Sequence, residues 1–378
     1  MNHRPRAAYI HIPFCVSKCW YCDFNSYSGL ESIFGDYTRA LAREIERAAP
    51  GPDGRLESVY FGGGTPTVLE TADISAILDA VKRCLGIGSN TEITIEANPG
   101  TVDRHKLCDL HEAGFNRLSL GVQSFDDEFL RSIGRVHDCA QAIEAYEAAR
   151  RAGFANIGID LIYALPDQSV DHWNHTLDTA IRLGSDHVSL YGLTIEPGTR
   201  FGELNDLGKL PVVDEETDAK MYELAIEKLT SAGYEHYEVS NFALPGYRSR
   251  HNTVYWLNEP YFGFGAGATS YTEGARSRRV ASPRDYISAI DSGEDALEFT
   301  ETLDQRARLG ETMVQGLRML EGVDTERVRR AVGLDPLIEC ASEIDLLTNR
   351  GLIEVTDHRL RVTHQGLLLL NYVAEHFV

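Results

Sequence analysis

The sequence has no apolar run that approaches the length of a membrane-spanning helix. It also has no excess of basic residues, because 36 Lys and Arg stand against 57 Asp and Glu, a formal net charge of −21 at pH 7. Nucleic-acid-binding surfaces need a basic balance, so this charge argues against a nucleic-acid partner. The basic residues 1–6 are followed by a predicted strand instead of the apolar region of a signal peptide. We therefore expect a cytoplasmic protein without a membrane span.

Cysteine is scarce, with seven in 378 residues, and three of the seven stand together near the start. Cys15, Cys19 and Cys22 have C-x3-C-x2-C spacing directly after an apolar run. Soft thiolates at such short spacing usually hold a soft metal centre. A structural zinc site is closed by four ligands, whereas three cysteines would leave one iron of a four-iron cluster open for a ligand that is not protein.

Three other interpretations of these cysteines stay open. Zinc is one, with His11 as the fourth ligand. A disulfide framework is favoured neither by the length of the chain nor by any secretory feature. A redox pair made by Cys19 and Cys22 would leave Cys15 without a role.

Strand and helix patterns alternate between residues 8 and 193. Strands are predicted at 8–12, 58–61, 92–97, 117–121, 156–162 and 186–193, and helices at 35–49, 72–84, 103–113, 126–133, 138–152 and 171–183, with a turn at 50–54. Such alternation implies a parallel sheet with helical crossovers. Because six units are visible instead of eight, the predicted fold class is α/β, with an open, partial (β/α)6 barrel.

The pattern changes after residue 200. A helix at 215–232 and a strand at 235–242, which adds a segment to the sheet, belong to an accessory segment, 201–300. A small C-terminal domain, 301–378, has predicted helices at 303–319, 325–332, 337–349 and from 366 onward, and strands at 352–355 and 359–362. This α+β order is winged-helix-like. The acidic balance speaks against DNA binding, so a lid or docking surface over the barrel is the expected role.

Polar residues collect where the predicted strands end. Gly63, Gly64 and Thr65 follow the second strand, and Glu96, Gln123, Asp160 and Thr194 lie at or near the ends of strands three to six. In such folds the functional face is formed by the carboxyl ends of the strands. Glycine also lets the backbone approach a ligand closely and makes its amides available as donors. The sequence therefore predicts one polar rim.

Residues 251–256 read H-N-x-x-Y-W. His251 is a candidate axial heme ligand, with Tyr255 and Trp256 as flat apolar walls. The other interpretation is an ordinary loop histidine beside two aromatic core residues. The glycine-rich segment 263–267 is too irregular for a nucleotide fingerprint and is predicted to be a close-packed loop.

The cysteine motif after the first strand resembles the radical S-adenosylmethionine (radical SAM) superfamily, and residues 9–26 resemble its HemN/HemW branch. The resemblance implies a [4Fe-4S] cluster on Cys15, Cys19 and Cys22, whose open iron chelates the amino and carboxylate groups of SAM. It also implies a set of SAM-contacting positions: Tyr9, Tyr21, Gly63, Gly64, Thr65, Glu96, Gln123, Arg135, Asp160 and Thr194. The chemistry is sensible, because carboxylates suit an ammonium and ribose hydroxyls, and Arg135 suits a carboxylate.

Within this branch, oxygen-independent coproporphyrinogen III dehydrogenases carry a further Cys where this chain has Phe24. The H-N-x-x-Y-W motif resembles the HemW-type heme chaperones instead. That resemblance implies heme as cargo and acceptor heme proteins as partners, including membrane-associated electron-transport proteins. A radical SAM enzyme of porphyrin biosynthesis and a zinc-stabilised module without a redox role are the alternatives.

Overall fold

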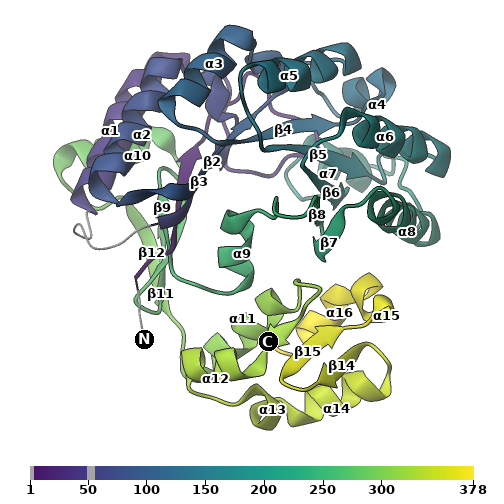
Figure 1. The fold of residues 1–378 in the computed structure, drawn as a ribbon. Helices are drawn as coiled ribbons and strands as arrows, with labels where there is room; N and C mark the ends of the chain where they lie inside the picture. Colours follow the sequence, from purple (N-terminus) through teal and green to yellow (C-terminus); the bar gives the residue numbers. More distant parts are fainter. Residues whose placement is uncertain (1–3, 49–55) are drawn as a thin grey trace.

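A computed structural model describes residues 4–48 and 56–378, and its main feature is a 12-stranded sheet with the order β12-β11-β10-β9-β1-β2-β3-β4-β5-β6-β8-β7 (Figure 1). Strands one to six are neighbours in chain order and pair in parallel. They are β1 (Ala7–Ile12), β2 (Leu56–Gly63), β3 (Ile87–Ala97), β4 (Arg117–Gln123), β5 (Ile157–Tyr163) and β6 (His187–Gly192). The predicted partial barrel is confirmed.

The crossover helices lie along the convex side of this curved sheet (Figure 1). They are α1 (Phe34–Arg47), α2 (Thr71–Cys84), α3 (Arg104–Ala113), α4 (Asp127–Ser132), α5 (Cys139–Arg151) and α6 (Val170–Leu183). In α1 the buried Tyr37, Leu41 and Ile45 recur every four residues, so one stripe of the helix packs on the sheet. Residue 49 of the first predicted helix and the predicted turn at 50–54 lie outside the described residues.

The sheet continues beyond both edges of the parallel part. β9 (Tyr261–Phe264) pairs in parallel with β1, and the antiparallel strands β10 (Thr269–Thr272), β11 (Ala275–Arg279) and β12 (Leu297–Thr302) follow. The expected loop at 263–267 is therefore wrong for its first two residues. A Cβ on Gly263 would stand 2.0 Å from the carbonyl oxygen of Thr269, so glycine is needed there for β9 to approach β10.

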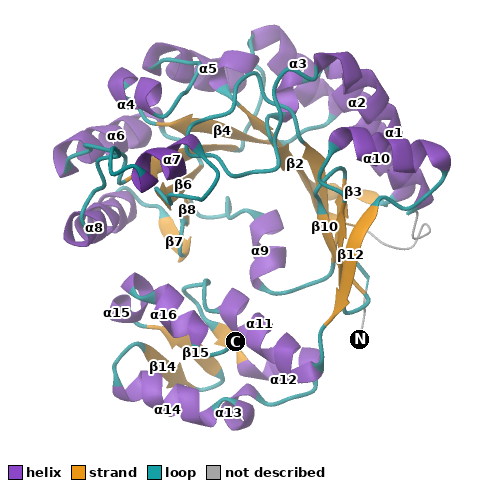
Figure 2. Cartoon of the chain, turned by 180° about the vertical axis from the view of Figure 1, so that it is seen from behind, coloured by secondary structure: helices purple, strands orange, loops and turns teal. Residues whose placement is uncertain are grey.

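At the other edge the predicted strand 235–242 is a hairpin of two short strands. β7 (Glu235–Glu238) and β8 (Asn241–Ala243) are antiparallel, and β8 pairs with β6. The remaining helices of this part are α7 (Arg200–Asp206), α8 (Glu215–Ser231), α9 (Arg250–Trp256) and α10 (Pro283–Ser292). The α9 helix contains the H-N-x-x-Y-W motif. It lies between the concave side of the sheet and the C-terminal domain (Figures 1 and 2).

The C-terminal domain has a three-stranded sheet and packs around a separate hydrophobic cluster, which includes Leu309, Val328, Leu360 and Val373 of this domain and Tyr222 of α8. Its strands are β13 (Val323–Asp324), β14 (Ile353–Thr356) and β15 (Arg359–Val362), and its helices are α11 (Gln305–Gly316), α12 (Thr325–Val332), α13 (Pro336–Glu339), α14 (Ala341–Asn349), α15 (His364–Leu368) and α16 (Leu370–Glu375). The predicted α+β character is confirmed. No helix in the described ranges is both long and apolar enough to cross a membrane.

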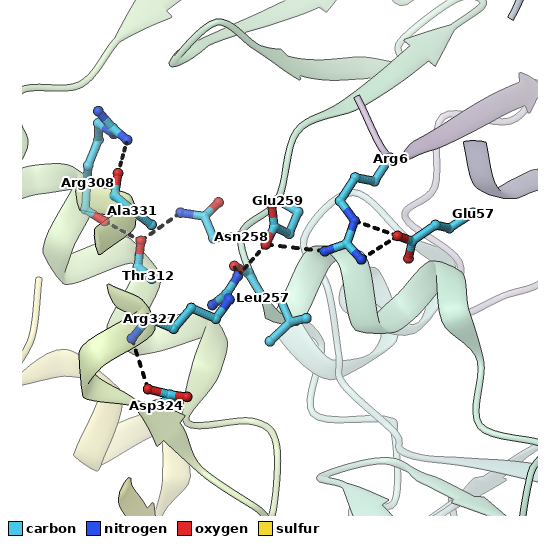
Figure 3. Close-up of polar contacts among 10 residues, drawn as sticks. All are labelled: Arg6, Glu57, Leu257, Asn258, Glu259, Arg308, Thr312, Asp324, Arg327 and Ala331. Atoms are coloured by element: carbon cyan, nitrogen blue, oxygen red, sulfur yellow. Dashed lines mark hydrogen bonds and ion pairs between the residues drawn. The ribbon is translucent and has the colours of Figure 1, made fainter. Parts of the chain in front are cut away.

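A chain of polar contacts joins this domain to the barrel (Figure 3). Arg327 of α12 donates to Glu259 at 2.8 Å and to the carbonyl oxygen of Leu257, the residue that follows α9. Glu259 also pairs with Arg6 at 3.4 Å, and Arg6 Nε donates to Glu57 at 2.8 Å. The C-terminal domain is thereby attached to both α9 and the first two strands.

Replacement of Arg327 should weaken this attachment. Arg327→Ala removes a half-buried ion pair and leaves a carbonyl without its donor, so we expect the free energy of unfolding to fall by about 1–3 kcal/mol. The matched control is Arg361→Ala, which removes an exposed pair with Glu354 in the same domain and should cost about 0–1 kcal/mol. Chemical denaturation measures both values, and equal losses would contradict a special role for Arg327.

Candidate functional site

A cavity of about 510 Å³ opens at the carboxyl-end edge of the parallel strands. Its lining comes from the loop after β1 and from all five strands that follow. It includes most of the sequence-predicted site residues: Cys15, Cys19, Cys22, Tyr21, Gly63, Gly64, Thr65, Glu96, Gln123, Arg135, Asp160 and Thr194. Residues from positions 15 to 194 are thus brought together in one place.

The cysteine loop is held at the cavity by the backbone and by Arg135. The amide of Cys15 donates to Tyr27 O at 2.9 Å, and the amide of Cys22 donates to Cys19 O at 3.3 Å. Arg135 Nη1 donates to Cys19 Sγ at 3.4 Å. Burial raises the pKa of the Cys15 and Cys22 thiols, and the neighbouring thiols raise it further. A metal centre would offset this cost by stabilising the thiolates.

The zinc interpretation does not fit this geometry. Both ring nitrogens of His11 are engaged, with Nε2 lying 2.9 Å from Asn25 O and Nδ1 lying 3.0 Å from the Tyr9 hydroxyl. Among residues 4–48 and 56–378, no three His, Cys, Asp or Glu side chains converge closely enough to hold one metal ion. Three half-buried thiols around a shared cavity fit a cluster of several irons better than a single ion.

The glycine turn after β2 is packed against β1 and the cysteine loop. A Cβ on Gly64 would stand 2.6 Å from Phe14 O, and a Cβ on Gly63 would stand 2.5 Å from the His11 ring. Gly63 also has φ +115°, a backbone conformation that favours glycine. The amides of Gly64 and Thr65 donate to Ile12 O at 2.9 Å and Phe14 O at 2.7 Å. The glycines are therefore required by the fold itself at this point.

Two half-buried carboxylates face the cavity from β3 and β5. Glu96 Oε1 accepts from the Tyr60 hydroxyl at 2.7 Å, and its Oε2 accepts from the Gly63 amide at 3.2 Å. Burial raises the pKa of Glu96 to about 7. Asp160 accepts from Ser119 Oγ at 3.2 Å, and burial raises its pKa as well. Such carboxylates suit a guest that brings a positive charge or hydroxyl groups.

One buried polar atom each of Gln123 and Arg135 has no hydrogen-bond partner among the described residues. Gln123 has φ +70°, and its Oε1 is buried without a hydrogen bond to any described residue, as is Arg135 Nε. Arg135 Nη2 donates to Asn98 Oδ1 and Gly121 O. Native interiors rarely leave buried polar atoms unpaired. The orphaned atoms fit a bound polar molecule in this cavity.

Tyr9 and His251 do not line the cavity but lie behind it. His251 is 1% exposed, and its Nδ1 and Nε2 each lie 3.0 Å from a hydroxyl oxygen, of Ser58 and of Tyr255 respectively. Its ring stacks on Tyr60 at 4.9 Å, and burial lowers its pKa to about 3. In this arrangement neither ring nitrogen is free to bind heme iron. The next residue, Asn252, does line the cavity.

Several lining residues were missed by reasoning from strand ends alone. Arg117, Ser119 and Gly121 alternate along β4 and reach the cavity together with the predicted Gln123. Tyr60 on β2 and Ser189 and Tyr191 on β6 reach it as well. The two-residue period of a strand would have found them, because every second side chain points into the barrel. The polar residues at these positions, with Gly121 as the exception, are the signal in the sequence.

Comparisons with known proteins agree with these features. Residues 9–180 match the Radical SAM superfamily, and residues 303–369 match the HemN C-terminal domain. Proteins named "Heme chaperone HemW" from Bacillus subtilis and Escherichia coli are 40% and 34% identical over 97% and 99% of this chain, and each match covers 98% of the relative. The solved structure of coproporphyrinogen III oxidase (HemN) from Escherichia coli superposes with a TM-score of 0.86 at 26% identity, covering 99% of this chain and 90% of that one.

The placement of His251 predicts a structural role for this side chain. His251→Ala would leave the Ser58 and Tyr255 hydroxyls unpaired and open a void beside Tyr60, so we expect a loss of about 2–5 kcal/mol in unfolding free energy. The control His105→Ala changes a side chain that is 87% exposed and should cost less than about 1 kcal/mol. Thermal and chemical denaturation check this, and a neutral His251→Ala variant would contradict the packing role.

Proposed function

We propose, since the chain belongs to the HemW family of radical SAM proteins, that it is a heme chaperone. It binds heme and transfers it to acceptor heme proteins in the cytoplasm or at the membrane surface. It carries a [4Fe-4S] cluster and binds SAM. The observation that carries the proposal is the 40% identity to the Bacillus subtilis heme chaperone, because that match covers nearly the full length of both chains.

The cavity supports the cofactor part of the proposal. Cys15, Cys19 and Cys22 would hold the cluster, which supplies a reducible centre with one iron open to the amino and carboxylate groups of SAM. Arg135 lies beside Cys19 and would balance negative charge next to the cluster. Glu96 and Asp160 would accept hydrogen bonds from the amino group or from the ribose hydroxyls of SAM. Gly63, Gly64, Thr65, Gln123 and Thr194 complete the lining of the cavity around the guest.

The second candidate is an oxygen-independent coproporphyrinogen III oxidase. The superposition on the HemN structure favours it, because the whole chain aligns. Phe24 weighs against it. This residue lines the cavity, is 64% exposed and replaces the further cysteine of those enzymes. We therefore rank heme transfer above porphyrinogen oxidation.

Heme titration of anaerobically reconstituted protein tests the proposal directly. We expect saturable binding at one heme per chain, followed by transfer of the heme to an apo heme protein on mixing. The same sample, given SAM, a reductant and coproporphyrinogen III, should form no protoporphyrinogen. Absence of heme binding, or turnover of coproporphyrinogen, would overturn the chaperone function.

The raised pKa of Glu96 predicts a pH dependence of SAM binding. At pH 6 a group with a pKa of about 7 is mostly protonated, and it ionises as the pH rises to 7.5. The ionised carboxylate accepts hydrogen bonds from the amino group of SAM more strongly and attracts its sulfonium charge, so affinity should rise by about fivefold to tenfold over this range.

Isothermal titration at the two pH values measures this effect. Glu96→Gln cannot ionise and should lose the rise, whereas Glu112→Gln, an exposed change on α3, should keep it. An affinity that is independent of pH in the unmodified protein would remove Glu96 as the partner of the SAM amino group.

A further inference from the structure

Arg117 is a buried cation at the inner end of the cavity. It begins β4, six positions before Gln123, and its side chain points to the same side of the sheet. It is 2% exposed and lines the cavity, together with Ser119 of the same strand and Asn252 of α9. The floor of the cavity therefore holds a guanidinium, a hydroxyl and an amide.

The Arg117 guanidinium is not fully paired within the described parts of the chain. Its Nε is buried and has no hydrogen-bond partner there. The two carboxylates whose charges act on Arg117 have other hydrogen bonds. Glu92 accepts from the amides of Arg250 and His251 at 3.1 and 3.2 Å, and Asp160 accepts from Ser119.

Charge and burial act in opposite directions on this side chain. Burial lowers the pKa of Arg117, but Glu92, Tyr60, Tyr237 and Asp160 raise it, and the net shift is upward. Arg117 is thus a permanent cation inside the barrel. A buried cation that lacks a partner is costly, and the planar fork of a guanidinium matches a carboxylate with two parallel hydrogen bonds.

We propose that Arg117 binds a carboxylate group of the molecule that occupies the cavity, and that Asn252 lies beside that group. The inference rests on the proposed function, which supplies a guest with this chemistry, heme with its propionate groups. The carboxylate of SAM, which the open iron would chelate, is the alternative source that the test separates. Arg135 is less suited to the same task. It already donates to Cys19, Asn98 and Gly121, beside the cysteine loop.

Matched ligand pairs identify the carboxylate. Binding of heme is compared with binding of heme dimethyl ester, and binding of SAM with binding of decarboxylated SAM, in the cluster-loaded full chain. If Arg117 receives a carboxylate, one acid-bearing ligand should bind at least about tenfold more tightly than its neutral partner, the range of a charged hydrogen bond.

Substitution then assigns this preference to Arg117. In Arg117→Gln the preference should disappear for that pair, and Arg117→Lys should keep a smaller preference because a single ammonium cannot form the bidentate contact. Arg131→Gln on α4 is the matched control, since this exposed arginine does not line the cavity and should leave both preferences unchanged. Iron content and circular dichroism confirm that each variant is loaded and folded.

The outcomes separate this inference from the chaperone function. Failure of the unmodified protein to bind heme would overturn the chaperone function, and the SAM pair would still test Arg117. If the unmodified protein prefers neither acid over its neutral partner, or if both preferences survive in the Arg117 variants, the inference is overturned. If Arg117→Gln fails to fold, the inference is tested by the preference for the acid-bearing ligand in the unmodified protein and by its reduction in Arg117→Lys.

Discussion

The site depends on the contact between two backbone turns, the cysteine loop after β1 and the glycine turn after β2. The amides of Gly64 and Thr65 donate to the carbonyls of Ile12 and Phe14, and no side chain fits between them. The Gly63 amide in turn donates to Glu96 on the next strand. One set of backbone contacts thus fixes the thiols relative to the Glu96 carboxylate. Because these hydrogen bonds join residues that are far apart in the sequence, the site exists only in the folded barrel.

Behind the cavity, the concave side of the sheet is polar where most barrel interiors are apolar. Glu92 binds the first amides of α9, and Ser58 and Tyr255 bind His251 of the same helix. At its other end the chain after α9 is held by Arg327 of the C-terminal domain. The α9 helix therefore connects the cavity floor, through Asn252, to the C-terminal domain.

Much of the barrel could be predicted from the sequence, because buried strands and amphipathic helices carry strong local periods. The polar rim followed from the same reasoning, since the ends of parallel strands meet at one edge. The antiparallel extension of the sheet was not predicted, and the reason is physical. β12 is exposed along its whole length, and β9 includes a glycine that packs on β10. The surroundings of His251 could not be predicted from the sequence either, because its hydrogen-bond partner Ser58 is 193 residues away in the chain. Arg117 was missed because it lies at the amino end of β4, whereas the predicted rim was sought at the carboxyl ends of the strands.

Electron paramagnetic resonance of the reduced, anaerobically reconstituted protein, recorded with and without SAM, tests the open-iron site most directly. A four-iron cluster on Cys15, Cys19 and Cys22 with one iron open should give a signal whose g values shift when SAM is added, and a Cys19→Ala sample should give little or no such signal. A signal that SAM leaves unchanged, or an intact cluster signal without Cys19, would contradict it.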